Sequence, residues 1–357
     1  MAIIAIDGGN YVTGQPVKSG INRLVNSFLK NIPDEGNTVI NYYYFGATAM
    51  PSSPHQHLHK LPQKFFGTIS LPFYTLKDRN TAFIAFSGYI PKPLQLFPIK
   101  KIGIVHDLGF FKYPELYRNP YRLQQDMKEL IKTSSVLVVF SDYVAEDVRK
   151  YFANTTVPVH RIYAGVDHIF TPSVLKKALQ EPESKKYFLY VGVLKPIKNI
   201  EYLLERYAAF RNKKNSDHTQ LILIGEKESS YFEQLQMNMS YQKYKKDISF
   251  IERVTDEELT RYYLGATAVI NVSREEGFCY PVLEAAALEK TVIVNNLPLY
   301  KEYTPYFDSI HIANSRQAVV AALEHAAKSK VTIPTLKKHL PQEFTWANFT
   351  HKLLALI

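Results

Sequence analysis

Short apolar runs that alternate with helical patterns constrain the fold of this chain more than any other feature. The runs AIIAI at 2–6, TVINYYYF at 38–45 and KIGIVH at 101–106 have the length and residue types of buried strands. Segments with apolar residues at helical spacing lie between such runs, as at 21–32 and 121–134. Strands that alternate with helices predict βαβ units and a mainly parallel sheet.

The alternation starts again in the second half of the chain, with strand-like runs from YFLYVGV at 187–193 to TVIVNN at 291–296. A length of 357 residues suits two cores better than one. We therefore expect an α/β protein with two doubly wound domains, at 1–170 and 171–340. An amphipathic helix at 341–357 has no strand partner, and the first domain is a candidate for its packing site. Ligands of such sheets sit at the carboxyl ends of the strands, so we expect the functional residues there.

Composition narrows the cellular setting. The single cysteine, Cys279, excludes an intramolecular disulfide and favours a reducing compartment. The start of the sequence has no basic region before an apolar run, and no apolar run approaches roughly 20 residues. We expect a cytoplasmic protein.

The formal net charge of +10 indicates an anionic partner. Between positions 54 and 105, seven basic residues face one acid, Asp78, and apolar residues interleave with them. The basic residues are Lys60, Lys64, Lys77, Arg79, Lys92, Lys100 and Lys101. Two interpretations stay open: a solvated basic face, or a surface that lies on an anionic membrane.

One strand-end loop reads VGVLKPIKN at 191–199. Gly192 would let the backbone approach a ligand closely, and Lys198 stands with Asn199 at the start of the next helix. A phosphate there would meet an ammonium group and free backbone N–H groups. A surface lysine in a tight turn is the alternative interpretation.

A second strand-end loop reads SREEGFCYPVLE at 273–284. Glu276 precedes a Gly277-Phe278 turn, Pro281 suits the first helical position, and Glu284 lies about one turn into the helix. A phosphate over this helix start would repel both carboxylates unless each bound something else, and vicinal hydroxyl groups are suitable ligands. The pattern therefore predicts a diphosphate between two polyols, which is the outline of a nucleotide sugar.

An acidic first helical turn is the alternative interpretation of this loop. It would explain Glu275 and Glu276, but neither the Gly-Phe pair nor a glutamate inside an apolar helix.

The segment E-G-F-x-x-P-V-L-E resembles the glutamate-x7-glutamate motif of retaining glycosyltransferases of family 4. Four further segments resemble that family in the expected order: KSGINRLV, IVHDLGFFKYPE, RIYAGVDHIFTP and VTDEELTRYYLGATAVINVS. The loop YFLYVGVLKPIKN resembles its glycine-loop segment. The resemblance implies a GT-B fold, in which two Rossmann-like domains face a central cleft. It implies that the domain at 1–170 binds the acceptor and the domain at 171–340 binds the nucleotide sugar.

The resemblance also implies roles. Glu276 matches a glutamate that contacts hydroxyls of the donor sugar, Glu284 one that holds the ribose diol, and Lys198 a lysine that neutralises the leaving diphosphate. His106 matches a histidine beside the donor sugar, so the implied catalytic residues are His106, Lys198 and Glu276. Main chain at Val254 would bracket the base. The remaining implied donor-binding residues are Gly8, Gly9, Gly192, Gly277, Phe278, Cys279, Tyr280, Pro281 and Val282.

Three positions depart from the family pattern. Ile197 replaces an arginine, Cys279 a glycine, and Val193 an arginine that many members carry. Neutralisation of a diphosphate would then depend more on Lys198, with Arg274 as a candidate helper.

The implied activity is retaining transfer of a sugar from a nucleotide-diphosphate donor to a saccharide hydroxyl, with a lipid-linked saccharide as one acceptor class. It implies no metal, no cofactor and no nucleic-acid partner, and it admits a peripheral location at the inner face of the membrane. Two alternatives stay open: a catalytically silent GT-B subunit that binds a partner or glycan, and a GT-B nucleotide-sugar epimerase.

Other site chemistries fit less well. His55, His57 and His59 lack accompanying carboxylates or cysteines, so we expect a polar loop there and no metal site. Cys279 has no neighbouring base to activate it as a nucleophile. The first strand leads into DGGNYVTG, without the G-x-G-x-x-G of a dehydrogenase.

Overall fold

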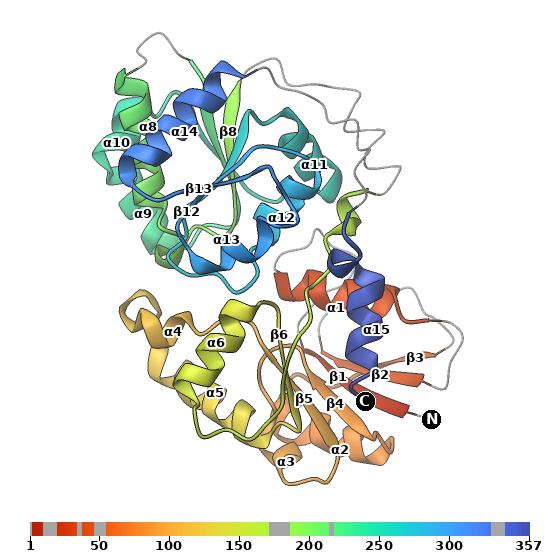
Figure 1. The fold of residues 1–357 in the computed structure, drawn as a ribbon. Coiled ribbons are helices and arrows are strands. Elements are labelled where there is room, and N and C mark those ends of the chain that lie inside the picture. Colours follow the sequence, from red (N-terminus) through yellow and green to blue (C-terminus); the bar gives the residue numbers. More distant parts are fainter. Residues whose placement is uncertain are drawn as a thin grey trace. The chain divides into compact units, whose positions relative to one another are not determined.

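The computed structural model describes residues 2–9, 20–33, 38–45, 55–170, 186–213, 218–329 and 340–357. The chain divides into two compact units (Figure 1). The N-terminal unit comprises Met1–Gly165 and Gln342–Ile357, and the C-terminal unit comprises Val166–Pro341. No helix in the described ranges is long and apolar enough to cross a bilayer.

The N-terminal unit contains a seven-stranded parallel sheet in the order β3-β2-β1-β4-β5-β6-β7. Strands β2 and β3 are added on one side of β1, and β4 to β7 are added on its other side. The strand order therefore reverses between β1 and β4. Such a reversal leaves space at the carboxyl ends of the two strands. The strands are β1 (Ala2–Gly9), β2 (Thr38–Tyr44), β3 (Gln56–Lys60), β4 (Ala82–Ala85), β5 (Lys100–Val105), β6 (Val136–Val139) and β7 (Val159–Arg161).

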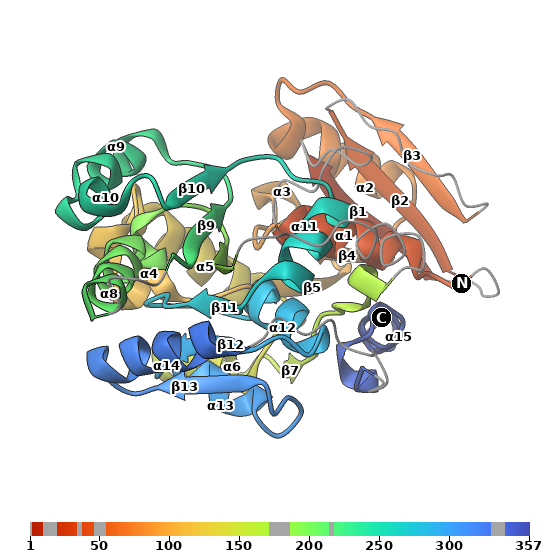
Figure 2. The same cartoon turned by 90° about the horizontal axis from the view of Figure 1, so that it is seen from above.

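Helices cover both faces of this sheet (Figures 1 and 2). They are α1 (Gly20–Lys30), η1 (Phe66–Ser70), α2 (Leu71–Lys77), α3 (Lys92–Gln95), α4 (Gly109–Lys112), η2 (Pro114–Leu116), α5 (Pro120–Thr133), α6 (Asp142–Tyr151), η5 (Gln342–Phe344) and α15 (Trp346–Leu354).

The C-terminal helix α15 packs on α1 of the N-terminal unit. The Phe344 ring stacks on Tyr163 at 4.7 Å between centroids, and Trp346 is buried. A Cβ atom on Gly165 would lie 2.3 Å from the Trp346 backbone nitrogen, so only glycine permits this approach. The end of the chain is therefore built into the first unit.

The C-terminal unit contains a six-stranded parallel sheet in the order β10-β9-β8-β11-β12-β13, with the reversal between β8 and β11. Its strands are β8 (Tyr187–Val191), β9 (Gln220–Ile224), β10 (Ile248–Ile251), β11 (Ala268–Asn271), β12 (Val292–Asn295) and β13 (Ile310–Ala313). Its helices are η3 (Asp167–Phe170), η4 (Pro196–Lys198), α8 (Ile200–Lys213), α9 (Ser229–Met237), α10 (Met239–Tyr244), α11 (Asp256–Gly265), α12 (Tyr280–Ala287), α13 (Pro298–Tyr303) and α14 (Arg316–Lys328).

The histidine-rich segment is a strand, so the prediction of a polar loop there is wrong. Residues Gln56–Lys60 pair in parallel with β2 as the edge strand β3. The His59 ring stacks on Tyr43, and its Nε2 atom lies 3.0 Å from Asn41 Oδ1. Backbone hydrogen bonding to β2 and these side-chain contacts stabilise the extended conformation, although the segment is rich in polar residues. In the described ranges no group of three His, Cys, Asp or Glu residues could hold a metal ion.

We expect Gly165→Ala to lower the free energy of unfolding by about 1–3 kcal/mol, because its Cβ atom would overlap the Trp346 backbone. Urea unfolding would measure this loss. Gly67→Ala is the matched control, because a Cβ atom on Gly67 meets nothing within 4 Å. Equal stability of both variants would show that the Gly165 contact does not constrain the packing of α15.

Candidate functional site

Two loops meet at the strand-order reversal of the C-terminal sheet. One follows β8 and the other follows β11, its neighbour in the sheet. The backbone N–H of Arg274 donates to the Ile197 carbonyl at 2.9 Å, and Asn199 Nδ2 donates to the Val272 carbonyl at 3.2 Å. These bonds tie the two sequence-predicted loops to each other.

The backbone around Lys198 explains its position. Pro196–Lys198 form the 3-10 turn η4, and Asn199 has a left-handed conformation (φ 58°, ψ 42°) before α8 begins. Asparagine tolerates this conformation better than most residues do. Ile197, at the arginine position of the family pattern, is buried and contributes packing rather than charge.

Glu276 is a buried carboxylate with three partners on one oxygen. Its Oε1 atom accepts from Lys198 Nζ at 2.7 Å, from Ser273 Oγ at 2.6 Å and from Asn271 Nδ2 at 3.4 Å. Burial opposes ionisation of Glu276, but the Lys198 ammonium and the two hydrogen bonds outweigh it and hold its pKa below the usual value. Oε2 has no hydrogen-bond partner in the described part of the chain, so it is available to a ligand hydroxyl.

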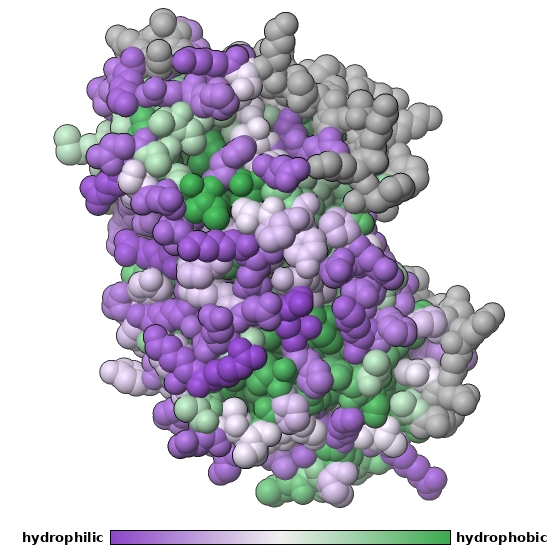
Figure 3. All heavy atoms as spheres, in the orientation of Figure 1, coloured by the Kyte–Doolittle hydropathy of each residue, from purple (hydrophilic) through white to green (hydrophobic). Residues whose placement is uncertain are grey.

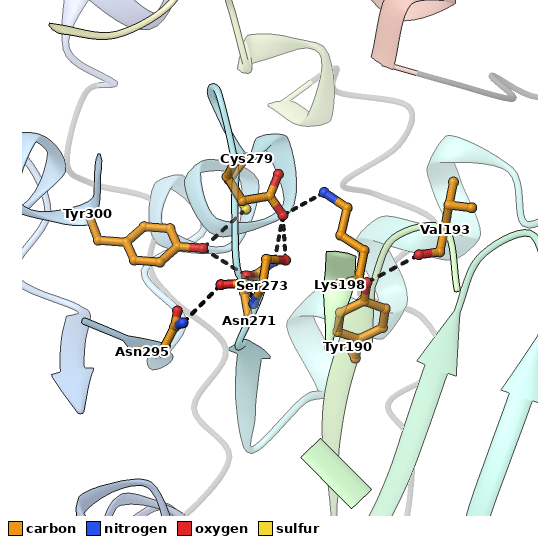
Figure 4. Close-up of polar contacts among 9 residues, drawn as sticks. Tyr190, Val193, Lys198, Asn271, Ser273, Cys279, Asn295 and Tyr300 are labelled. Carbon is orange, nitrogen blue, oxygen red and sulfur yellow. Dashed lines mark hydrogen bonds and ion pairs between the residues drawn. The ribbon is translucent and has the colours of Figure 1, made fainter. Parts of the chain in front are cut away.

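A further layer of polar residues holds the Glu276 loop. Asn271 Oδ1 accepts from the Tyr300 hydroxyl at 2.7 Å and from the Ser273 backbone N–H at 3.1 Å. Asn295 Nδ2 donates to the Ser273 carbonyl at 2.8 Å (Figure 4). Sequence reasoning missed this layer, although a polar residue at the end of the apolar run TAVIN was a visible signal for Asn271.

Cys279 stands in a left-handed conformation (φ 57°, ψ 67°) immediately before α12. A glycine adopts this conformation without strain, whereas another L-residue costs roughly 1–2 kcal/mol. Cys279 therefore takes on this cost at a position where the family pattern has a glycine. Burial, followed by the Glu276 charge, raises the pKa of the Cys279 thiol well above its usual value, which disfavours a nucleophilic thiolate.

The first turn of α12 contains no acidic residue. The helix begins at Tyr280, so Glu275 and Glu276 precede it and are not part of an acidic first turn. Pro281 occupies the first turn, as expected.

Glu284 is buried within α12 and both of its oxygens are held. Oε1 lies 3.0 Å from His168 Nε2, on η3, and Oε2 accepts from the Tyr263 hydroxyl, on α11, at 2.7 Å. Its carboxylate therefore joins three segments that are far apart in sequence. Sequence reasoning missed His168 and Tyr263.

The other predicted donor-binding residues lie at the same edge of the C-terminal sheet. Gly192 follows β8 with φ +150°, and a Cβ atom there would lie 2.8 Å from the Tyr190 hydroxyl. Val254 is partly exposed in the loop between β10 and α11. Phe278 and Val282 are buried, and the Phe278 carbonyl accepts from the Tyr303 hydroxyl at 2.7 Å.

Three predicted residues belong to the N-terminal unit and lie at carboxyl ends of its strands. A Cβ atom on Gly8 would fall 2.2 Å from the Tyr42 ring, and Gly9 has φ +43°, so both positions require glycine. His106 follows β5, and its Nε2 atom lies 2.7 Å from the Phe86 carbonyl. Burial lowers the pKa of His106, so a neutral ring that donates to Phe86 through Nε2 is the favoured form.

Comparison with known proteins identifies the C-terminal unit. Residues 173–336 match the family model described as glycosyl transferases group 1. The match lies within the C-terminal unit and covers less than half of the chain. The family expected from the sequence motifs is therefore confirmed for the segment that carries Lys198, Glu276 and Glu284.

Two curated relatives are O-antigen chain mannosyltransferases. RfbU of Salmonella typhimurium is 28% identical over 199 residues, which cover 56% of this chain and 52% of the relative. O-antigen chain mannosyltransferase B of Escherichia coli is 26% identical over 222 residues, which cover 58% and 55%. The chain spans about half the length of the curated relatives it matches.

Solved structures show the fold over the whole chain. Sucrose-phosphate synthase from Thermosynechococcus elongatus has a TM-score of 0.77 at 18% identity, covering 100% of this chain and 98% of that one. WaaG, a glycosyltransferase involved in lipopolysaccharide biosynthesis, has a TM-score of 0.69 at 13% identity, covering 98% and 94%. The expected α/β class with two Rossmann-like domains, the GT-B fold, is confirmed.

We expect Lys198→Met to lower the free energy of unfolding by about 2–3 kcal/mol at neutral pH, because it leaves the Glu276 charge buried without its counter-ion. Urea unfolding of the single variant and of Lys198→Met/Glu276→Gln would measure this effect. The double variant should be the more stable of the two. Equal loss in both would contradict the role of the ion pair.

The pH dependence follows from the same pair. The pKa of Glu276 is lower in the folded state than in the unfolded chain, so its contribution to stability is present above the unfolded pKa. That contribution is lost as the pH falls through the folded pKa. Lys198→Met should remove this part of the acid-induced loss of stability.

Proposed function

We propose that the chain is a retaining glycosyltransferase of family 4 that moves a sugar from a nucleotide-diphosphate donor to a hydroxyl of a saccharide. The observation that carries the proposal is the Lys198–Glu276 pair, at 2.7 Å, between two strand-end loops at the reversal of the C-terminal sheet. The pair gives a partly buried ammonium group next to a carboxylate whose second oxygen can accept a sugar hydroxyl. The carboxylate can bind the sugar and the ammonium group can bind the diphosphate on either side of the bond that breaks.

The donor would extend along the carboxyl edge of the C-terminal sheet. Glu276 accepts from hydroxyls of the transferred sugar, and Glu284 accepts from the ribose diol while His168 and Tyr263 hold its carboxylate in place. Lys198 and the backbone N–H groups at the start of α12 meet the diphosphate between them. In this proposal the sugar, the diphosphate and the ribose meet Glu276, Lys198 and Glu284 respectively.

The chemistry follows from the charges. As the bond to the sugar breaks, negative charge develops on the diphosphate and positive charge on the sugar ring. Lys198 stabilises the first, and the ionised Glu276 is complementary to the second. The acceptor hydroxyl attacks from the face that the diphosphate leaves, and its proton passes to the departing phosphate. Positioning and electrostatic stabilisation then supply the catalysis without a metal or another cofactor.

The relatives suggest the class of sugar and acceptor. Their names describe O-antigen chain mannosyltransferases, so a hexose donor and a growing polysaccharide, lipid-linked in such assembly, fit this chain. A carbohydrate acceptor leaves no role for a nucleic acid.

A catalytically silent subunit is the second candidate, favoured by the buried Ile197 and by Val193 at positions where arginine is usual. Without these arginines, the cations in the two loops are Lys195, Lys198 and Arg274. The intact Lys198–Glu276 pair favours the enzyme.

We further propose that the N-terminal unit docks on an anionic membrane from the cytoplasmic side. Phe65 immediately before η1, Ile69 in η1 and Phe73 in α2 recur every fourth residue, and their exposed fractions are 58%, 59% and 57%. Leu96, just after α3, is 88% exposed. Figure 3 shows hydrophobic surface over this lower part of the N-terminal unit, where Figure 1 labels α2 and α3.

Basic side chains surround these apolar residues. Lys64, Lys77 and Lys92 are exposed, and the Lys64 ammonium lies 5.3 Å from the Phe65 ring centroid. Lys101, in contrast, is buried and donates to the Phe97 carbonyl at 2.7 Å, so it does not belong to the basic surface expected from the sequence. On an anionic bilayer, the exposed apolar side chains would enter the acyl region and the ammonium groups would contact the anionic headgroups.

Nucleotide binding tests the enzyme proposal. We expect one of UDP, GDP and dTDP, or the sugars they carry, to raise the melting temperature and to be hydrolysed slowly at the sugar bond. Glu284→Ala should abolish the stabilisation, because it removes the ribose ligand. Glu233→Ala, at an exposed position on α9, is the matched control.

The outcomes separate the candidates. Stabilisation without sugar release, in the presence of saccharide acceptors, would favour the silent subunit. Conversion of one nucleotide sugar into another without any saccharide acceptor would favour the epimerase. No stabilisation by any nucleotide would contradict the proposal.

Vesicle binding tests the membrane proposal. The full chain should co-sediment with vesicles that contain anionic lipid, and the variant Phe65→Ser/Ile69→Ser/Phe73→Ser should lose about 10-fold or more in partition coefficient, because it removes the apolar anchors. Tyr121→Ser, also an exposed apolar residue of this unit, is the control. Binding that ignores the anionic lipid fraction, or that survives in the triple variant, would overturn this proposal.

A further inference from the structure

Arg274 is an exposed cation close to the Lys198–Glu276 pair. It lies in the loop after β11, directly after Ser273 and two residues before Glu276. Its side chain is exposed, and within the described part of the chain its guanidinium group takes part in no hydrogen bond or ion pair, including none with the neighbouring Glu275. The guanidinium group is therefore available to an anion that arrives from solvent.

The charge of Lys198 is already matched inside the protein. Its ammonium group lies 2.7 Å from Glu276 Oε1, and both side chains are largely buried. A carboxylate at this distance offsets much of the ammonium charge, so the pair presents little net positive charge to a ligand. A departing nucleoside diphosphate carries several negative charges, and their stabilisation requires a further cation.

Hydrogen bonds fix the position of Arg274 at the junction of the two strand-end loops. Its backbone N–H donates to the Ile197 carbonyl at 2.9 Å. Ser273, the residue before it, donates through Oγ to Glu276 Oε1 at 2.6 Å. Ile197 stands where the family pattern has an arginine, and its side chain is buried and uncharged. Arg274 therefore brings a guanidinium group to the junction that lacks this arginine.

A guanidinium group suits a diphosphate well. It stays protonated at physiological pH, and its planar fork of N–H donors can bind two phosphate oxygens at once. The Lys198 ammonium group, in contrast, is a compact point charge that Glu276 holds in place. Because the Arg274 guanidinium group has no protein partner among the described residues, it loses no such contact when it binds an anion.

We propose that Arg274 binds the diphosphate of the donor and, with Lys198, stabilises the negative charge that develops there. This inference rests on the proposed function, because it assigns a further catalytic residue to that reaction. The bond between the anomeric carbon and the diphosphate oxygen breaks, and its electron pair stays on that oxygen. The acceptor oxygen bonds to the same carbon, and its proton passes to the diphosphate. Arg274 keeps its own proton throughout.

Calorimetric titration of the full chain at low ionic strength tests the proposal, with inorganic pyrophosphate, UDP, GDP and dTDP as probes. We expect Arg274→Met to weaken the binding of pyrophosphate and of at least one nucleoside diphosphate about 10-fold. Arg274→Lys keeps the charge without the planar fork, so it should recover part of the loss. Arg316→Met is the matched control, because Arg316 is exposed at the start of α14, after the edge strand β13.

The rate of sugar release separates a catalytic role from a structural one. With a sugar of the nucleotide that binds, Arg274→Met should lower kcat about 10-fold or more and change KM less, because the charge on the diphosphate grows toward the transition state. The melting temperature of Arg274→Met should equal that of the wild type, since the side chain is exposed and has no partner among the described residues. A lower melting temperature with an unchanged kcat would contradict the catalytic role.

The probes separate this inference from the proposed function. If no nucleotide binds to the wild type, the proposed function fails, whereas pyrophosphate binding that depends on Arg274 would still support an anion site at this loop. Three results would overturn the inference. They are the absence of binding of all four probes to the wild type, equal affinities of the wild type and Arg274→Met, and a loss that Arg274→Lys does not recover in part.

Discussion

The ion pair between Lys198 and Glu276 is the interaction on which the candidate donor site depends. It joins a loop from each side of the strand-order reversal, and a backbone hydrogen bond from the Arg274 N–H to the Ile197 carbonyl reinforces the junction. A buried carboxylate is stable only with compensation, and Lys198, Ser273 and Asn271 all direct their donors to the same oxygen. This one-sided arrangement fixes the carboxylate while leaving its second oxygen to a ligand.

Glu284 is also a buried carboxylate that the fold compensates: His168 and Tyr263, from two other segments, contact its two oxygens. Burying a glutamate in an otherwise apolar helix costs free energy unless other parts of the chain supply hydrogen-bond partners for its carboxylate. The left-handed Cys279 adds a local cost at the same helix start. Strain and buried charge thus concentrate within nine residues of sequence, as is usual where a protein binds a ligand.

The sequence predicted the parts of the structure that depend on local pattern. Apolar strand runs, Lys198 beside Asn199, and the glutamate spacing all carry short-range signals. It did not predict β3, whose histidines become extended by pairing with β2, nor the burial of Lys101 against the Phe97 carbonyl. His168 and Tyr300 could not be found because the fold brings them to Glu284 and Asn271 from distant parts of the chain.

The contact of Gly165 with Trp346 bears on how the protein assembles during synthesis. The C-terminal unit is one continuous stretch of chain, whereas the N-terminal unit is made of two stretches separated by the whole of the other. The unit that is translated first therefore remains incomplete on the ribosome until α15 emerges, and the unit translated second can finish folding before it. The α1 surface that α15 covers in the folded protein therefore stays exposed until the last part of the N-terminal unit has been synthesised.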